Sequence, residues 1–439
     1  MRPYIVVVPP MTRTAAIATL GCKTNQFESA ALEERLTAAG WSIVPFEAGA
    51  ELVIVNTCTV TAATDSQSRN LIRRARRLHP ACRVVVTGCY AQVDPQALAA
   101  IPGVALVLGN EEKRDLLRLL AEEGDGAVRV SAIRDTTTAE VATLGSFAER
   151  SRAFVQIQNG CDAFCAYCII PYARGRSRSV PAEQVLQQVR DFVAAGYPEI
   201  VLTGIHIGGY GGDFTPVTNL TTLLQRLLTE TRVKRLRLGS IEPTEIPDTL
   251  LDLLASSAVL CPHLHIPLQS GDDAVLARMG RRCDTAFFGA LVERIRARLP
   301  DAAIGLDVIV GFPGETEEEF AHTHAFIASL PVSHLHVFPF SKRPGTPAAT
   351  MGSQIPGEVA KARAAQLRAL GEGKLTAFAQ RFVGREMEVV VEGGKGNARR
   401  GLSRNYLNVR FTGGEELIGQ AVMLRIVGVE GEVLRGELL

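Results

Sequence analysis

Three cysteines in one short loop constrain this chain more than any other feature of its sequence. Cys161, Cys165 and Cys168 have the spacing CxxxCxxC and directly follow an apolar run that is typical of a buried strand. Three thiolates in such a loop can hold three irons of a 4Fe–4S cluster and leave the fourth iron open to another ligand. Zinc binding and plain core packing are the alternatives, but a zinc knuckle needs a fourth Cys or His, and the next histidine, His206, is distant in the sequence. The spacing favours the cluster.

A second set of three cysteines is indicated by topology rather than by spacing. Strand-like runs at 15–20, 52–56, 83–87 and 104–108 alternate with helical stretches at 26–39, 63–78 and 95–100, which predicts a parallel α/β sheet. Cys22, Cys58 and Cys89 each follow one of the first three runs. Because the carboxyl ends of parallel strands share one edge, we expect the three thiols to converge, with three buried structural cysteines as the alternative.

A second α/β series follows a polar, linker-like stretch at 125–151. Strands are expected at 153–158, 199–203, 235–238, 263–267, 303–310 and 334–339, each followed by a helical stretch. Six such units favour a partial barrel whose active site lies on the loops after the strands. A helix at 358–381 then leads to a short segment of alternating residues that predicts a small all-β barrel.

Composition and charge exclude several classes of protein. The chain of 439 residues is 46% hydrophobic and 21% charged, which is typical of a globular protein of two to four domains, and its apolar runs are too short to span a membrane. We therefore expect a soluble, cytoplasmic protein without a membrane partner. An odd number of cysteines without a targeting segment fits metal or catalytic use rather than disulfides, and Met11 is an alternative start to Met1.

With these motifs in view, the chain resembles the methylthiotransferases of the radical S-adenosylmethionine (radical SAM) class from about residue 14 to the carboxyl terminus. The resemblance rests on Leu20-Gly21-Cys22, Asn56-Thr57-Cys58 and Gly88-Cys89-Tyr90, on the Cys161 loop, and on the motif from Gly311 to Thr316. It implies a Rossmann-like amino-terminal domain, a partial (β/α)6 barrel and a carboxyl-terminal RNA-binding TRAM barrel. The implied boundaries are an extension at 1–12 and domains at 13–140, 141–375 and 376–439.

The resemblance also implies the chemistry. The cluster on Cys161, Cys165 and Cys168 would pass an electron to SAM, whose radical would remove hydrogen from an unactivated carbon. A second 4Fe–4S cluster on Cys22, Cys58 and Cys89 would carry the sulfur that is methylated and transferred. Motifs such as Ser240-Ile241-Glu242-Pro243 look most like the subgroup that acts on N6-threonylcarbamoyladenosine at position 37 of tRNA. An electron donor such as flavodoxin or ferredoxin would be a further partner.

Cofactor and RNA contacts are expected on the rim of the barrel and in two basic segments. Tyr167 is a candidate for the adenine of SAM, with core packing as the alternative. The candidates for the SAM ribose and amino acid, with Glu242 foremost because a carboxylate accepts hydrogen bonds from hydroxyl and ammonium groups, are Gly204, Ser240, Glu242 and Gln269. The candidates for RNA contact are Arg174, Arg176 and Arg178 after the cluster loop and Lys395, Arg399, Arg400 and Arg404 in the carboxyl-terminal barrel.

Three other functions compete with this interpretation. Two lie inside the family, where sister subgroups modify isopentenyl-adenosine in tRNA or an aspartate of a ribosomal protein. The third is a non-catalytic iron–sulfur protein that binds RNA, although a purely structural cluster is normally fully ligated. A basic tail segment is equally compatible with a solvated charged hairpin.

Overall fold

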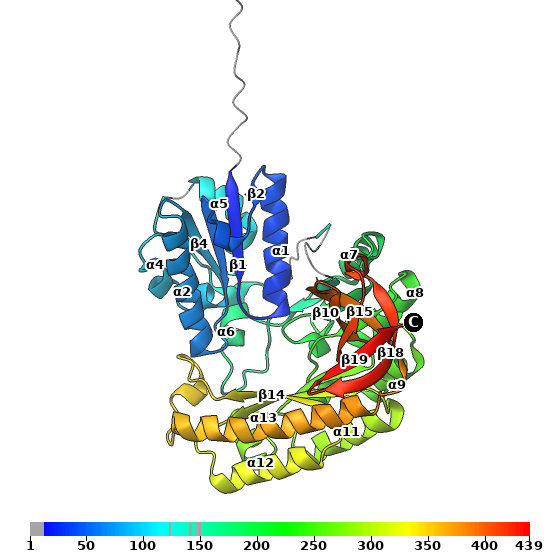
Figure 1. Cartoon of the computed structure of the whole chain (residues 1–439). Coiled ribbons are helices and arrows are strands. Elements are labelled where there is room, and N and C mark those ends of the chain that lie inside the picture. Colours follow the sequence, from blue (N-terminus) through cyan, green and yellow to red (C-terminus); the bar gives the residue numbers. More distant parts are fainter. Residues whose placement is uncertain (1–12, 123, 140–142, 146, 148–150) are drawn as a thin grey trace, which may run out of the picture. The chain divides into compact units, whose positions relative to one another are not determined.

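The computed structural model describes residues 13–122, 124–139, 143–145, 147 and 151–439. The predicted extension at 1–12 and the predicted boundary at 140 lie outside this range. The chain divides into two compact units, which are described separately: the first contains the residues up to Ile133 together with Tyr172–Arg174, and the second contains Arg134–Pro171 and Gly175–Leu439. Figure 1 shows the elements of both units.

The first unit is a doubly wound sheet of six parallel strands in the order β2-β1-β3-β4-β5-β6. In chain order its strands are β1 (Thr14–Thr19), β2 (Ser42–Ile43), β3 (Leu52–Thr57), β4 (Arg83–Gly88), β5 (Val104–Leu108) and β6 (Ala127–Arg129). Its helices are α1 (Lys23–Ala38), α2 (Ala62–Leu78), α3 (Cys89–Val93), α4 (Pro95–Ala99) and α5 (Leu116–Glu122).

Helices cover both faces of this sheet because each central strand has apolar side chains on both faces. Along β3, Val53 and Val55 pack with residues of α2, α3 and α4, whereas Leu52 and Ile54 pack with residues of α1 and α5. A strand buried on both sides is typical of a parallel α/β sheet. The predicted start of the linker at 125 was wrong, because β6 (Ala127–Arg129) pairs with β5 as a short edge strand.

Six parallel strands of the second unit form the predicted partial barrel, which confirms the fold class. They are β7 (Arg152–Gln156), β10 (Glu199–Thr203), β11 (Leu236–Leu238), β12 (His263–Gln269), β13 (Ala303–Val310) and β14 (His334–Pro339). They form two three-stranded sheets that isolated parallel bridges join between Leu236 and Leu260 and between Ser240 and His265. The surrounding helices are α7 (Ala182–Ala194), α8 (Leu220–Glu230), α9 (Asp248–Ser256), α10 (Asp273–Met279), α11 (Thr285–Arg298) and α12 (Glu317–Ser329).

A long helix and a closed five-stranded barrel complete the second unit. The helix is α13 (Gly357–Gln380), and the strands are β15 (Glu386–Lys395), β16 (Ala398–Ser403), β17 (Asn408–Thr412), β18 (Ala421–Glu430) and β19 (Val433–Leu438). Phe378 at the end of α13 shares one hydrophobic core with Val389 of β15, Leu424 of β18 and Ala303 of β13. This common core attaches the carboxyl-terminal barrel to the partial barrel within the unit.

Buried charge also joins the two barrels. Glu199, at the start of β10, is fully buried and accepts hydrogen bonds from Arg235 and Arg237 at 2.7 to 3.0 Å. Arg237 also donates to the carbonyls of Ser403 and Arg404 at 3.0 and 2.9 Å. Burial alone would raise the pKa of Glu199, but Arg237 and Arg235, together with Arg152 at 3.5 Å, lower it to about 2.

We predict that Glu199→Gln destabilises the second unit by about 3 kcal/mol, because two buried guanidinium groups lose their shared anion. The folded-state pKa is lowered, so the contribution of Glu199 is complete above the ordinary pKa near 4.5 and is lost as the pH falls through about 2. Calorimetric unfolding of parent and variant should differ at pH 7 and converge in acid. Glu230→Gln, which changes an exposed carboxylate paired with Arg226, is the matched control and should behave as the parent does. A Glu199→Gln protein as stable as the parent at pH 7 would contradict this account.

Candidate active site

The loop with Cys161, Cys165 and Cys168 is held by backbone contacts at the carboxyl end of β7. Cys161 donates its backbone N–H to the carbonyl of Gly175 at 3.0 Å, and Cys168 donates to the carbonyl of Cys165 at 2.9 Å. Gly160 has φ +74°, and a Cβ there would lie 1.8 Å from the carbonyl oxygen of Arg176. A glycine is therefore required where the chain enters the loop.

Gln158 connects the cysteine loop to the loop after β10. Its side chain is fully buried, and its amide donates to the carbonyl of Gly160 at 2.7 Å and to Ser177 Oγ at 2.9 Å. Its Oε1 accepts from the backbone N–H groups of Ile205 and His206 at 3.1 and 2.7 Å. Gln158 thus fixes two segments of the rim relative to each other.

His206 lies beside Cys161, although its distance in the sequence had argued against a position near the three cysteines. Its Nδ1 is 3.7 Å from Cys161 Sγ, and its Nε2 is 2.8 Å from Glu245 Oε1. Burial alone would lower the pKa of His206, but its contacts with Cys161 and Glu245 raise it to about 10. The position of His206 directly after β10, on the same rim as the cysteines, was the sequence signal that could have placed it there.

Arg281 connects Glu242, the Pro267 carbonyl and the second cysteine. Its guanidinium binds Glu242 through two hydrogen bonds of 2.6 and 3.1 Å and the Pro267 carbonyl at 2.7 Å, and it lies 3.8 Å from Cys165 Sγ. A small hollow opens at this point. It is lined by Ala163, Cys165, His206, Glu242, Thr244, Glu245, Gly280, Arg281 and Arg282.

The other cofactor candidates are distributed around the same rim. Tyr167 packs against the buried cluster that includes Met279 and Phe312, so the core-packing alternative describes its position. Ser240 is exposed, and Gln269 has φ +75° at a bulge of β12, which is rare for a residue other than glycine. A Cβ at Gly204 would lie 2.8 Å from the carbonyl oxygen of Gln158. Of the candidates, only Glu242 lines the hollow beside Cys165.

The structure brings Cys22, Cys58 and Cys89 together at the carboxyl edge of β1, β3 and β4 in the first unit. The thiol of Cys58 interacts electrostatically with both of the others, and Cys22 interacts with Cys89. A Cβ at Gly21 would lie 2.7 Å from Cys58 Sγ, so the glycine allows the loops to approach. The three thiols therefore lie at one edge of the sheet, as the predicted order of parallel strands implied.

Both thiol sets fit a cluster by their donor chemistry, because cysteine thiolates are the usual ligands of iron–sulfur clusters. Burial raises the pKa of Cys58 to about 11 and that of Cys168 to about 12, so binding of iron must displace a proton from each.

Arg174 belongs to the first unit, and its buried position contradicts the role in RNA binding that the sequence predicted for it. Its side chain is 0% exposed and binds both carboxylate oxygens of Glu28 and the amide oxygen of Asn25. Its Nε donates to Cys89 Sγ at 3.1 Å. With Lys113 2.6 Å from Glu28, it forms a buried charge network beneath the thiols and cannot reach a phosphate.

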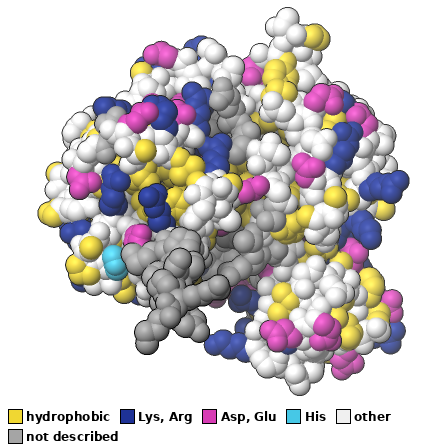
Figure 2. Space-filling view, turned by 90° about the horizontal axis from the view of Figure 1, so that it is seen from above, with side chains coloured by type: hydrophobic (Ala, Val, Ile, Leu, Met, Phe, Trp, Pro, Cys, Tyr) yellow, Lys and Arg dark blue, Asp and Glu magenta, His cyan; other side chains and the backbone are white. Residues whose placement is uncertain are grey.

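Three other arginines predicted to contact RNA are engaged within the protein. Arg178 is buried and donates to the carbonyl of Arg176 at 3.2 Å. Arg399 is buried and donates to the carbonyl of Gly414 at 2.8 Å, and Arg404 pairs with Glu388 and the carbonyl of Leu260. Arg176, Lys395 and Arg400 are exposed. Figure 2 shows a face on which basic and acidic side chains are interspersed.

Comparison with known proteins now identifies the class. The sequence model of the Radical SAM superfamily matches residues 155–327, and that of the uncharacterized protein family UPF0004 matches residues 14–109. Among solved structures, the radical S-adenosylmethionine methyltransferase TsrM from Kitasatospora setae has the same fold, with a TM-score of 0.57 and 18% identity over 77% of this chain and 75% of TsrM. The class is that of the radical SAM enzymes, which use SAM and a 4Fe–4S cluster.

Curated relatives define the family more narrowly. The chain is 42% identical over 94% of both lengths to the threonylcarbamoyladenosine tRNA methylthiotransferase MtaB of Bacillus subtilis, and 38% identical to that of Aquifex aeolicus over 94% of this chain and 99% of the relative. It is 33% identical to the tRNA-2-methylthio-N(6)-dimethylallyladenosine synthase of Desulfitobacterium hafniense over 99% of this chain and 98% of the relative. The chain belongs to the methylthiotransferase family of radical SAM enzymes.

We predict that Arg281→Lys lowers SAM cleavage by the reconstituted protein at least about tenfold, because an ammonium cannot hold Glu242 through two parallel hydrogen bonds while also binding the Pro267 carbonyl. Iron content should stay at the parent level, since the three cysteines are unchanged. Arg282→Lys, at the exposed neighbouring position that lines the same hollow, is the control and should cleave SAM normally. Equal cleavage by the two variants would show that the Arg281 contacts have no part in the site.

Proposed function

We propose that this protein adds a methylthio group to carbon 2 of N6-threonylcarbamoyladenosine at position 37 of tRNA. The observation that carries the proposal is the 42% identity, over 94% of both chains, to a relative whose name states a threonylcarbamoyladenosine tRNA methylthiotransferase. The two sets of three thiols support it, because this reaction must both break an unactivated C–H bond and deliver sulfur.

Each thiol set has a separate role in the proposal. Cys161, Cys165 and Cys168 hold the cluster at the rim of the partial barrel, and Cys22, Cys58 and Cys89 hold a second 4Fe–4S cluster in the first unit. When bound, the clusters and SAM supply the radical, the sulfur and the methyl group. The protein itself contributes thiolates, and in the second set the buried Arg174 adds a charge-assisted contact to Cys89.

The side chains around the hollow bind and orient SAM in this proposal. Glu242 is held by Arg281, and its carboxylate oxygens accept hydrogen bonds from ribose hydroxyls or from the ammonium group. Gly204, Ser240 and Gln269 contribute from neighbouring loops, and Tyr167 packs against the core next to the cysteine loop. Gln158 holds the cysteine loop and the His206 loop in register while SAM binds.

Binding of tRNA is assigned to the basic residues that remain exposed. Arg176 lies eight residues after Cys168, and Lys395 and Arg400 lie on β15 and β16 of the carboxyl-terminal barrel. Their contribution is electrostatic and should weaken with salt.

A one-electron donor of the flavodoxin or ferredoxin type is required as a second partner. A tRNA substrate agrees with the cytoplasmic location expected from the sequence. Among the described residues, no helix is long and apolar enough to cross a membrane.

We predict that a strain without this gene lacks 2-methylthio-N6-threonylcarbamoyladenosine and accumulates the unmethylthiolated nucleoside. Mass spectrometry of tRNA nucleosides should show that a Cys82→Ala copy restores the modification, whereas Cys58→Ala and Cys165→Ala copies do not. Cys82 is the matched control because it is a buried cysteine of the first unit that belongs to neither thiol set.

Two outcomes would contradict this function, and a third would contradict the role of Cys58. Loss of the methylthio group from dimethylallyladenosine instead would assign the chain to the substrate named in the Desulfitobacterium relative. An unchanged nucleoside profile would exclude a tRNA substrate and direct the search to ribosomal protein. Full activity of the Cys58→Ala copy would leave the first unit without a catalytic role.

A further inference from the structure

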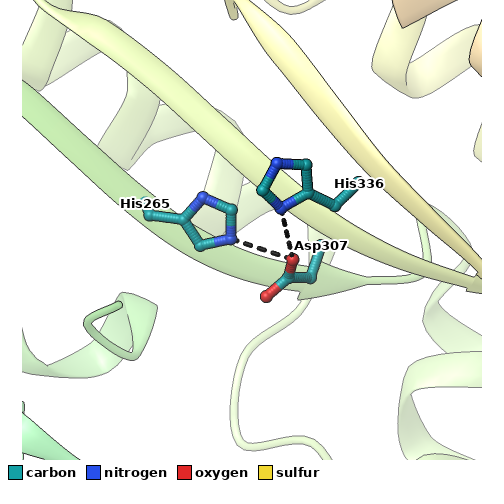
Figure 3. Close-up of side chains that lie close together, drawn as sticks. All are labelled: His265, Asp307 and His336. Atoms are coloured by element: carbon teal, nitrogen blue, oxygen red, sulfur yellow. Dashed lines mark ion pairs between the residues drawn. The ribbon is translucent and has the colours of Figure 1, made fainter. Parts of the chain in front are cut away.

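A cluster of metal-ligating side chains lies inside the second unit, apart from both cysteine sets. His265 of β12, Asp307 of β13 and His336 of β14 point toward one another from three adjacent strands (Figure 3). His265 Nε2 is 2.9 Å and His336 Nδ1 is 3.3 Å from the same oxygen, Asp307 Oδ1. The three ligand atoms all lie within 4.8 Å of one another.

The strand register places these side chains on one face. Asp307 is the direct neighbour of His336 in the pairing of β13 with β14, and Gly305, two residues earlier on β13, is the neighbour of His265. A Cβ at Gly305 would lie 2.2 Å from His334 Nε2 and 2.8 Å from His265 Nδ1. The glycine therefore leaves the space that the histidine rings fill, and paired strands hold the three ligands with little freedom.

The donor set suits a cation, because one carboxylate and two imidazoles each offer one ligand atom to an ion placed among them.

We propose that His265, Asp307 and His336 bind one divalent transition-metal ion of the zinc type. Two imidazoles and one carboxylate suit zinc and its first-row neighbours, whereas magnesium and calcium prefer an all-oxygen set. Ligand atoms about 2.0 to 2.1 Å from a tetrahedral ion lie about 3.3 Å apart, and the observed separations of 2.9 and 3.3 Å match this spacing. The set contains no sulfur and is distinct from both iron–sulfur sites.

Three protein ligands leave at least one coordination position open, and the exposed fractions show on which side. The side chain of His265 is 10% exposed, whereas that of His336 is 49% exposed. The open position is therefore reached from the side of His336 and takes water or an oxygen atom of another molecule. Pro267, whose carbonyl binds Arg281, is two residues beyond His265, about 7 Å along the strand, so the ion would lie within the same unit as the Arg281 contacts.

Metal content of the protein reconstituted with iron and sulfide tests the proposal. After treatment with a chelator and incubation with zinc sulfate, desalted parent protein should retain about one zinc per chain without loss of iron. Asp307→Asn and His336→Gln conserve side-chain size and should each lower zinc affinity at least about tenfold. His322→Gln is the control, because His322 pairs with Asp272 on an exposed surface of the same unit.

X-ray absorption at the zinc edge distinguishes this site from adventitious binding to cysteine. The proposal requires nitrogen and oxygen neighbours with imidazole scattering and no sulfur in the first shell. It is overturned if the parent retains no zinc, if Asp307→Asn and His336→Gln retain as much as the parent, or if sulfur surrounds the bound zinc. In the first case the three side chains form only a hydrogen-bonded cluster.

Discussion

Parallel pairing is the constraint on which both units of this protein depend. In the main sheet of the first unit and in the partial barrel of the second, every strand runs parallel to its neighbours, so the loops that follow the strands all leave from one edge. Cys22, Cys58 and Cys89 reach a common point by this route. By the same route, the Cys161 loop, the His206 loop and Glu242 meet at a separate point within the second unit. Chemistry that requires several side chains from distant sequence positions is thus assembled by topology.

Buried charges then determine how the assembled parts are held. Glu199 joins two arginines of the partial barrel, one of which donates to backbone carbonyls of the carboxyl-terminal barrel. Glu28 likewise pairs with Arg174 and Lys113 in the first unit, and Arg174 contacts Cys89. Each carboxylate has a pKa lowered to about 2 by its cationic partners, despite a burial that would raise it. An unpaired buried charge is costly, so each network fixes one arrangement of its members.

The sequence allowed the order and type of the main elements to be predicted, because near-continuous apolar runs report directly on strands that are buried on both faces. The runs expected at 104–108, 199–203, 303–310 and 334–339 coincide with β5, β10, β13 and β14. Short edge strands such as β6 escaped, since three half-exposed residues carry no alternation. The positions of cysteines at strand ends were equally readable, because they follow from topology alone.

Side-chain partners could not be predicted in the same way. Arg174 and Arg178 appear in the sequence as basic residues near the reacting site, but burial and nearby acceptors in the fold turn both inward. His206 was set aside for its distance in sequence, although the strand order brings it to Cys161. The His265, Asp307 and His336 cluster has no sequence signature, because its members belong to three strands whose register is known only from the structure.

The central claim is that two independent sets of three thiols each hold a cluster. Its most direct test is the iron and sulfide content of the anaerobically reconstituted chain, with Mössbauer spectroscopy to identify the cluster type. The account predicts about eight irons per chain in the parent, about half of that in Cys58→Ala and in Cys165→Ala, and almost none when both are changed. A parent with only about four irons, or a Cys58→Ala variant that keeps the full content, would contradict it.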